Sequence, residues 1–261
     1  MQENILEIKN LSKYFGGLAA VSDCSLKIKK GTITGIIGPN GSGKTTLFNL
    51  IAGNLKSSAG SVMFNNENIT DVPSYELFSK GLLRTFQIAH EFTNLSVLEN
   101  LMMVPGNQSG EKLMNALLKP SLVAKEESQI KEKAMDVVDF LNLCHLKNEL
   151  AGNLSGGQKK LLELGRTMMV DAKLVLLDEV GAGVNRTLLK DLGTAIEKLN
   201  KEKGYTFCMI EHDMDFIGRL CDPVIVMAEG SVLFEGSVED AKKDEKVIES
   251  YLGRGSKLKD N

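Results

Sequence analysis

The sequence has no long apolar run, little net charge and few cysteines. No uninterrupted apolar stretch among its 261 residues approaches the roughly 18 residues of a membrane-spanning helix. Residues 1–5 include an acid and too few apolar side chains to begin a secretory signal. A formal net charge of −3 gives no indication of a nucleic-acid-binding surface or of strong attraction to an anionic membrane.

The cysteines form no close pair in the sequence. They stand at Cys24, Cys144, Cys208 and Cys221. Such scattered thiols are typical of small buried apolar groups in a reducing compartment, and they exclude a disulfide framework or a cysteine metal cluster. We therefore expect a cytosolic protein that associates with a membrane only through partners.

Strand-like and helix-like segments alternate through much of the chain. Residues 5–8 and 25–29 alternate apolar with polar side chains, as half-buried antiparallel strands do. Residues 32–37 are more fully apolar and β-branched, which predicts a central buried strand. Residues 173–179 and 205–210 repeat that pattern later, separated by helical segments. Strands that alternate with helices predict an α/β core with a mainly parallel sheet, preceded here by an N-terminal antiparallel β subdomain.

The middle of the chain is helical. From residue 96 to residue 150 almost every segment has helical spacing, with breaks near residues 106–110 and 119–121. We expect a helical subdomain, at about residues 90–160, inserted into a single domain of residues 1–253. The polar residues 254–261 are predicted to be a C-terminal tail.

The first chemical motif is a phosphate loop. It follows the strand at residues 32–37 and precedes a helix, and it reads Gly38-Pro39-Asn40-Gly41-Ser42-Gly43-Lys44-Thr45. Glycines let backbone N–H groups curl around phosphate oxygens, and the N-terminus of the following helix attracts the same anion. Lys44 is placed to reach the outer phosphates and Thr45 to bind Mg²⁺, with Thr46 beside them. The motif predicts a P-loop NTPase core that binds a nucleotide.

Two acids end the strand at residues 173–179. Asp178 is placed to hold Mg²⁺ through water, and Glu179 to polarise the water that attacks the γ-phosphate. Acids at strand ends are also common caps, so the phosphate loop upstream is what gives this pair its catalytic interpretation.

A third motif stands before a helix between these two. It reads Leu154-Ser155-Gly156-Gly157-Gln158. Ser155 is a good helix N-cap, and the glycines free the backbone to approach a phosphate.

With these three motifs the chain resembles the ATP-binding subunits of ABC transporters, from Leu6 to about Gly253. The resemblance makes residues 154–158 the family's signature sequence, in which Ser155, Gly156, Gly157 and Gln158 bind nucleotide. It implies that Phe15 stacks on adenine, with Tyr14 as the alternative if the alignment slips. The implied cofactors are ATP and Mg²⁺.

The same resemblance assigns two more catalytic positions. Gln87 matches the glutamine that touches Mg²⁺ and the attacking water at the joint with the helical subdomain. His212 matches the switch histidine that contacts the γ-phosphate. His90 and His145 lack such a context, and we expect them to be structural.

Residues 183–185 match the segment that crosses the interface between two such subunits. Two positions depart from the family pattern: Val180 stands where Pro is usual after the catalytic Glu, and Asn185 ends the interface segment where Asp is usual. Neither position is expected to touch the phosphates, so activity is not in doubt.

Residues 84–87, 94–100, 182–185 and 249–253, together with the long helical insert, resemble the ATPases of branched-chain amino-acid importers. Related ATPases serve urea or amide uptake and lipopolysaccharide export, and these stay as alternatives. A GTPase would need an Asn-Lys-x-Asp guanine reader, whereas residues 200–203 end in Lys203. A non-transport ABC protein acting on DNA or ribosomes resembles tandem cassettes or carries a coiled-coil insert, and this chain has neither feature.

The resemblance also implies a mechanism and partners. Two subunits facing head to tail bind two ATP molecules, each between Lys44 of one chain and Ser155 of the other. The second ATPase subunit is either identical or different. Transmembrane permease subunits carry the transported molecule, which places this chain at the cytoplasmic face of the membrane as a peripheral subunit.

Overall fold

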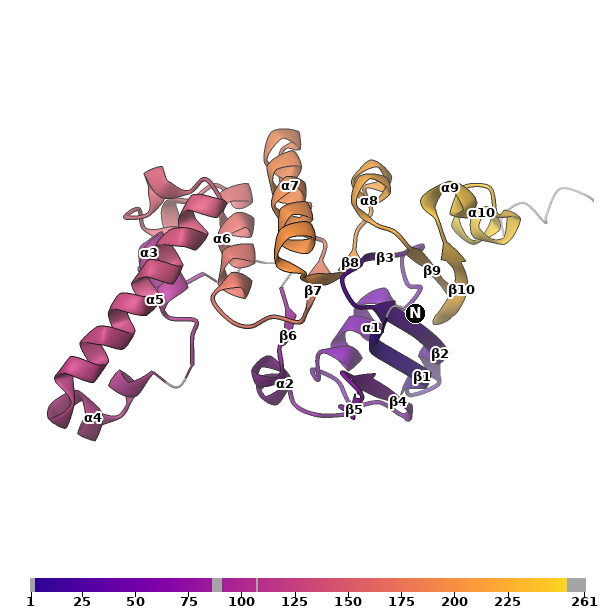
Figure 1. Ribbon diagram of the computed structural model, residues 1–261. Coiled ribbons are helices and arrows are strands. Elements are labelled where there is room, and N and C mark those ends of the chain that lie inside the picture. Colours follow the sequence, from indigo (N-terminus) through magenta and orange to yellow (C-terminus); the bar gives the residue numbers. More distant parts are fainter. Residues whose placement is uncertain (1–2, 86–90, 107, 253–261) are drawn as a thin grey trace, which may run out of the picture. The chain divides into compact units, whose positions relative to one another are not determined.

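The computed structural model describes residues 3–85, 91–106 and 108–252 (Figure 1). The chain divides into two compact units, and each is described by itself. The first comprises Met1–Arg84, Lys173–Gly181 and Ile196–Asn261, and the second comprises Thr85–Ala172 and Ala182–Ala195. Gln87, His90 and the predicted tail lie outside the described residues.

The first unit begins with an antiparallel sheet in the order β2-β1-β4-β5. Its strands are β1 (Asn4–Phe15), β2 (Leu18–Lys29), β4 (Ala59–Phe64) and β5 (Glu67–Asn68). Leu6 and Ile8 are fully buried, whereas Lys9 is exposed. The predicted alternation holds from Leu6 to Lys9, whereas Ile5 is buried too, next to a register shift between β1 and β2.

The second sheet of this unit has the order β10-β9-β3-β8-β7-β6. All neighbouring strands run parallel except β10, which pairs antiparallel with β9. The strands are β3 (Ile33–Ile37), β6 (Leu82–Arg84), β7 (Leu174–Asp178), β8 (Thr206–Ile210), β9 (Val224–Ala228) and β10 (Ser231–Gly236). Every residue of β3, β7 and β8 is buried, as expected for a parallel sheet covered by helices. The predicted fold class is confirmed.

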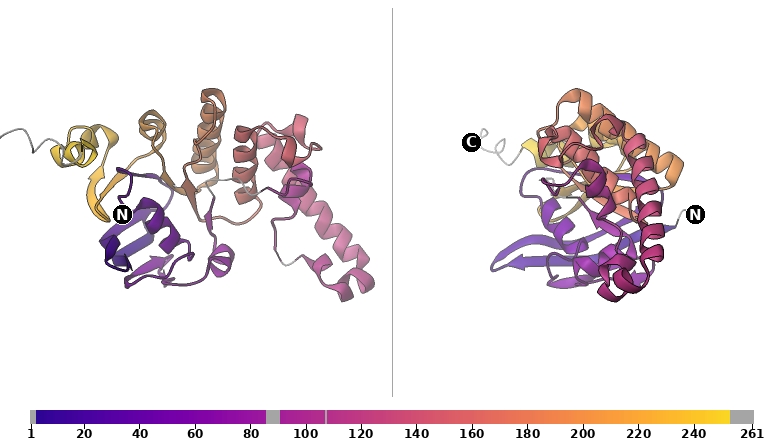
Figure 2. Two further views of the ribbon diagram at one scale, coloured as in Figure 1. Left: turned by 180° about the vertical axis from the view of Figure 1, so that it is seen from behind. Right: turned by 90° about the vertical axis from the view of Figure 1, so that its left-hand side faces the viewer.

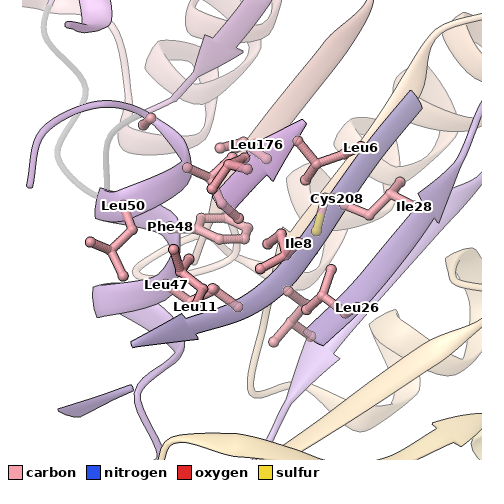
Figure 3. Packing of buried hydrophobic residues seen from close by; sticks show 14 of the residues in the cluster. Leu6, Ile8, Leu11, Leu26, Ile28, Leu47, Phe48, Leu50, Leu176 and Cys208 are labelled. Atoms are coloured by element: carbon pink, nitrogen blue, oxygen red, sulfur yellow. The ribbon is translucent and has the colours of Figure 1, made fainter. Parts of the chain in front are cut away.

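Helix α1 packs between the two sheets of this unit (Figure 3). The helices of the unit are α1 (Lys44–Ile51), α2 (Ser74–Lys80), α8 (Met214–Leu220), α9 (Val238–Ala241) and α10 (Glu245–Leu252). Phe48 of α1 is fully buried in one cluster with Ile8 of β1 and Leu176 of β7. Burying one such side chain stabilises the fold by about 1.5–3 kcal/mol. This packing fixes the N-terminus of α1, and the glycine-rich turn before it, relative to the two sheets of the unit.

The second unit is helical. It contains α3 (Val97–Met102), α4 (Leu113–Leu118), α5 (Pro120–Phe140) and α6 (Gly156–Met168), with short 3₁₀ turns at Ser109–Glu111, Cys144–Leu146 and Ala151–Asn153. Ala134, Val137 and Val138 of α5 are buried at the spacing that the sequence indicates. Both views in Figure 2 place α4 at the beginning of α5, where Pro120 occupies the first helical turn.

Helix α7 (Arg186–Lys203) begins in the second unit and ends in the first. Within the described parts of the chain, no helix combines the length and the apolar character that crossing a membrane requires.

Candidate active site

The phosphate loop connects β3 to α1, and neighbouring backbone surrounds it closely. Gly38 has φ 147°, and a Cβ there would lie 2.1 Å from the carbonyl oxygen of Met227. Gly43 has φ 97°, and a Cβ there would lie 2.3 Å from the carbonyl oxygen of Ala20. Only glycine is compatible with both this backbone conformation and this approach. Strands β2 and β9 therefore determine the shape of the loop.

Lys44 is the first residue of α1, and its side chain turns back over the loop. Its Nζ donates to the carbonyl oxygens of Gly38 at 2.8 Å and Pro39 at 3.0 Å. Burial lowers the pKa of Lys44, and the carboxylates of Glu179 and Asp178 oppose that shift. A buried ammonium held by carbonyl oxygens can exchange these partners for the oxygens of a bound phosphate.

A cavity of about 400 Å³ opens beside the loop. Its lining comes from strands β1 and β2, the loop, α1, and the segments that follow β7 and β8: Phe15, Leu18, Ala19, Ala20, Asn40, Gly41, Ser42, Gly43, Lys44, Thr45, Thr46, Glu179 and His212. The Phe15 ring is 47% exposed, and the Nζ of Lys13 lies 5.3 Å from its centroid. Tyr14 is not among the lining residues, so Phe15 borders the cavity and Tyr14 does not.

Glu179 and His212 meet across the ends of two neighbouring strands. The Nε2 of His212 lies 3.1 Å from the Oε1 of Glu179. The backbone N–H of Glu179 donates to the carbonyl of Ile210 at 2.9 Å. Glu179 has φ 48°, a left-handed conformation that costs a residue with a side chain about 1–3 kcal/mol. That backbone turn aims the carboxylate into the cavity and away from the sheet.

Asp178 ends β7 and is buried beside Arg84, the last residue of β6. The Nη2 of Arg84 donates to the Oδ2 of Asp178 at 2.6 Å, and its Nη1 donates to the Oδ1 of Asn49 at 2.6 Å. In the sequence, Arg84 stands out only within the segment that resembles one subgroup, and Asn49 matches no motif. No local pattern indicates that these residues meet.

Glu211 is a second residue for which the sequence gives no role. Its Oε1 accepts a hydrogen bond of 2.7 Å from the N–H of Gly181, and its Oε2 accepts one of 3.3 Å from the N–H of His212. Burial raises the pKa of Glu211, and the Glu179 carboxylate adds to that shift, while the two N–H donors oppose it. Glu211 thus ties the backbone after Glu179 to the backbone that carries His212.

The signature sequence begins α6 in the second unit. Ser155 is the N-cap, as the sequence predicts: its Oγ accepts from the N–H of Gln158 at 3.4 Å, and the Gln158 Oε1 accepts from the N–H of Ser155 at 2.9 Å. A Cβ on Gly157 would lie 2.5 Å from the Cδ1 of Leu188, so helix packing alone requires glycine there. Ser155 and Gly156 are exposed, which leaves them accessible to a ligand.

Asn185, which departs from the family pattern, precedes α7. Its Oδ1 accepts a hydrogen bond of 2.9 Å from the N–H of Leu188. Asn and Asp are comparable N-caps, so the substitution keeps this contact while removing a charge. Val180, the other departure, is buried.

The donor set fits a magnesium ion that is completed by nucleotide. Thr45 is exposed to the cavity, and the hydroxyl of Thr45 and the carboxylate of Asp178 are the hard oxygen donors that Mg²⁺ prefers. Across the described residues no cluster of three His, Cys, Asp or Glu side chains could hold a metal. Gln87, the third predicted ligand, lies outside the described residues.

A family model described as "ABC transporter" matches residues 21–182. The probable branched-chain amino acid transport ATP-binding protein LivG of Archaeoglobus fulgidus is 44% identical over 249 residues, which are 95% of this chain and 95% of that protein. This chain belongs to the ABC transporter family. The high-affinity branched-chain amino acid transport ATP-binding protein BraF of Pseudomonas aeruginosa is 34% identical to this ABC ATPase, over 97% of the chain and 99% of the relative.

Solved ABC ATPase structures have the same fold. A nucleotide-free ATP-binding cassette from an ABC transporter is 40% identical, with a TM-score of 0.82, and covers 96% of this chain and all of its own length. An ATP-binding cassette of an ABC transporter in its ADP conformation is 40% identical, with a TM-score of 0.81. The protein is thus an ATP-binding, ATP-hydrolysing subunit of the ABC transporter family.

Proposed function

We propose that this ABC ATPase drives the uptake of branched-chain amino acids through a transmembrane permease. The observation that carries the chemistry is the single cavity lining shared by Lys44, Thr45, Glu179 and His212. The substrate class is supported by relatives named for branched-chain amino acid transport, which match this chain along nearly their full length.

In the proposed reaction the phosphate loop and the N-terminus of α1 bind the triphosphate, with Lys44 moving from the loop carbonyls to the outer phosphate oxygens. Glu179 accepts a proton from the water that attacks the γ-phosphate. His212 holds the Glu179 carboxylate through the 3.1 Å contact between them and also lines the space for the γ-phosphate. Phe15 stacks on the base.

Thr45 and Asp178 would hold Mg²⁺, together with Gln87. When bound, the ion neutralises charge on the phosphate oxygens. The protein residues supply its position.

The site is completed by a second ATPase subunit in this proposal. Ser155, Gly156, Gly157 and Gln158 of that partner close over the ATP held by Lys44, with the Ser155 capping box presenting the exposed N-terminus of α6 to the phosphates. Residues 183–185 cross the same interface. Release of the γ-phosphate removes these contacts and reopens the pair.

A permease partner is supported by exposed apolar surface on the helical unit. Four side chains of α4 are between 65% and 75% exposed: Leu113, Met114, Leu117 and Leu118. An apolar surface concentrated in one short helix is typical of an interaction site. Contact with permease subunits would place this ATPase at the cytoplasmic face of the membrane, as a peripheral subunit.

Transport in whole cells tests the substrate. Cells that lack this chain should lose uptake of radiolabelled leucine, isoleucine and valine, and the wild-type chain should restore it while uptake of urea stays the same. Loss of urea or amide uptake, or of lipopolysaccharide export, would instead assign the chain to one of those related transporters.

Lys44→Ala tests the site in the same cells and with purified protein. Loss of charge-assisted hydrogen bonds worth about 1.5–3 kcal/mol each should weaken ATP binding roughly 10- to 100-fold and abolish uptake. The control is Lys173→Ala, which removes the exposed lysine immediately before β7. Unchanged binding of labelled ATP by the Lys44 variant would overturn the assignment of the phosphate loop.

A further inference from the structure

Arg84 is a buried cation that the proposed mechanism does not use. Its side chain is 10% exposed, and that of its partner Asp178 is 6% exposed. By contrast, the ion pair of Lys80 with Glu67 in the same unit, at 2.7 Å, has side chains 30% and 58% exposed. Burying a charged pair costs several kcal/mol per ion before attraction is counted, so such a pair is weak evidence of a contribution to stability.

The sheet register aims Arg84 at helix α1. Arg84 lies opposite Leu176 in the parallel ladder between β6 and β7, and Asp178 follows two residues later on the same face of β7. Leu176 packs in one cluster with Phe48 of α1 (Figure 3). The guanidinium therefore lies between the end of β7 and α1, where it reaches both Asp178 and Asn49.

Both bonds of Arg84 are short, and they use separate nitrogens. Nη2 holds one oxygen of Asp178 and Nη1 holds the amide oxygen of Asn49, each at 2.6 Å. The third nitrogen, Nε, is buried and has no hydrogen-bond partner within the described part of the chain. Arg84 thus connects these two side chains while one of its own donors, Nε, is left without a hydrogen bond among the described residues.

The bridge that Arg84 makes between Asn49 and Asp178 affects the positions of the proposed magnesium ligands Thr45 and Asp178. Thr45 and Asn49 are four residues apart in α1 and lie on the same face of the helix. Asp178 keeps its Oδ1 clear of the bond to Arg84, which is made through Oδ2. A bridge from Asn49 to Asp178 therefore fixes the spacing between the helix face that carries Thr45 and the strand end that carries the carboxylate.

We propose that Arg84 is a positioning residue that bridges Asn49 and Asp178 and so sets the separation of the Mg²⁺ ligands Thr45 and Asp178. The inference rests on the proposed function, because it needs a Mg²⁺–nucleotide complex in this cavity. In this arrangement Arg84 acts through Asn49 and Asp178. It also begins the segment 84–87 that leads to Gln87, so the same bridge anchors the start of that segment to the metal-binding end of β7.

Titration of Mn²⁺ into the purified protein–ADP complex, followed by electron paramagnetic resonance, tests the bridge without any turnover. Arg84→Met removes both bonds, and we expect it to weaken Mn²⁺ binding roughly 10- to 100-fold, as is typical when a residue that orients a metal ligand is lost. Binding of ADP in EDTA should stay within about twofold of wild type, because the phosphate loop is untouched. The Mg²⁺ concentration for half-maximal ATPase should rise by the same factor as the Mn²⁺ dissociation constant.

If Arg84→Met folds poorly, variants that remove only part of the bridge can test the same inference. Asn49→Ala frees Arg84 from α1 but leaves its pair with Asp178, so Mn²⁺ binding should weaken in the same direction by a smaller factor. Arg84→Lys keeps the charge but cannot make two bonds in a fixed fork, and it should resemble Asn49→Ala. Lys80→Ala breaks the exposed pair with Glu67 and should leave Mn²⁺ binding unchanged.

These measurements distinguish a failure of the Arg84 bridge from a failure of the proposed metal site. Unchanged Mn²⁺ binding in Arg84→Met and Asn49→Ala, with only a lower melting temperature, would make the bridge structural and overturn the inference. Tighter Mn²⁺ binding would also overturn it, because Arg84 would then be a competitor of the metal. A wild-type protein that binds ADP with no effect of Mn²⁺ or Mg²⁺ would overturn the proposed metal site itself.

Discussion

At the scale of single residues, the site depends on side chains held by partners from other segments. Glu179 contacts His212, Asp178 contacts Arg84, and Glu211 holds the N–H of Gly181. Each contact positions a charged group whose orientation a flexible side chain alone would not maintain. The orientation of Glu179, Asp178 and the backbone at Gly181 therefore depends on partners from other segments of the chain.

Glu211→Gln tests the electrostatic cost of one such group. Burial raises the pKa of Glu211 above its ordinary value, so the folded state binds the proton more tightly than the unfolded state. Ionisation of Glu211 therefore destabilises the folded state. This destabilisation is absent below the ordinary pKa of a glutamate and grows as the pH rises from that value to the raised pKa. The melting temperature of the glutamine variant, relative to wild type, should increase across that window.

The amide of the variant can still accept a hydrogen bond from Gly181, so at acid pH the two proteins should differ by no more than about 1 kcal/mol in free energy of unfolding. Thermal unfolding followed by circular dichroism at a series of pH values provides the comparison. Glu202→Gln, which changes an exposed carboxylate, is the control. A difference that stays constant with pH would show that burial does not raise the pKa of Glu211.

At the scale of elements, the functional segments lie where helices begin. The phosphate loop precedes α1, Ser155 caps α6, and Asn185 caps α7. Helix N-termini present unpaired N–H groups and partial positive charge, so they suit both anion binding and capping side chains. Side-chain caps stabilise the starts of α6 and α7, whereas α1 begins at Gly43 without a capping side chain.

Asn185→Ala tests the cap of α7. Loss of the bond from the N–H of Leu188 to the Asn185 side chain should lower the free energy of unfolding by about 1 kcal/mol. Asn185→Asp keeps an acceptor oxygen and adds a favourable charge at a helix N-terminus, so its stability should equal or slightly exceed that of wild type. Urea titration measures both; equal loss in the two variants would mean that the side-chain oxygen is not the stabilising group.

At the scale of the whole molecule, the residues proposed to contact nucleotide belong to two different units. Lys44, Glu179 and His212 belong to the first unit, and Ser155 belongs to the second. The proposal that a second subunit supplies the signature sequence makes pairing a condition of hydrolysis.

Glu179→Gln tests pairing and catalysis at once. An amide cannot accept the proton of the attacking water, so ATP turnover should fall about 10²- to 10⁴-fold while ATP binding persists. Gel filtration with ATP should then show a stable pair that is absent without ATP, if two copies of this chain associate. If the natural partner is a different ATPase, the pair appears only when that subunit is added.

Glu202→Gln again provides a control and should hydrolyse ATP as the wild type does. Wild-type turnover in Glu179→Gln would remove Glu179 from its proposed role. ATP turnover that stops without any pair forming, with either partner, would contradict the shared site.

The sequence by itself determined the fold class, the phosphate loop and the cap at Ser155, because these follow from periodicity, glycine content and capping within a few neighbouring residues. Only the tertiary structure decided which distant side chains meet. Arg84 contacts Asn49 and Asp178, 35 and 94 residues away, and Glu211 contacts Gly181, 30 residues away. It also decided that Phe15 lines the cavity and Tyr14 does not. The physical reason is that strand register and packing select the face on which each side chain lies, and no local pattern contains that information.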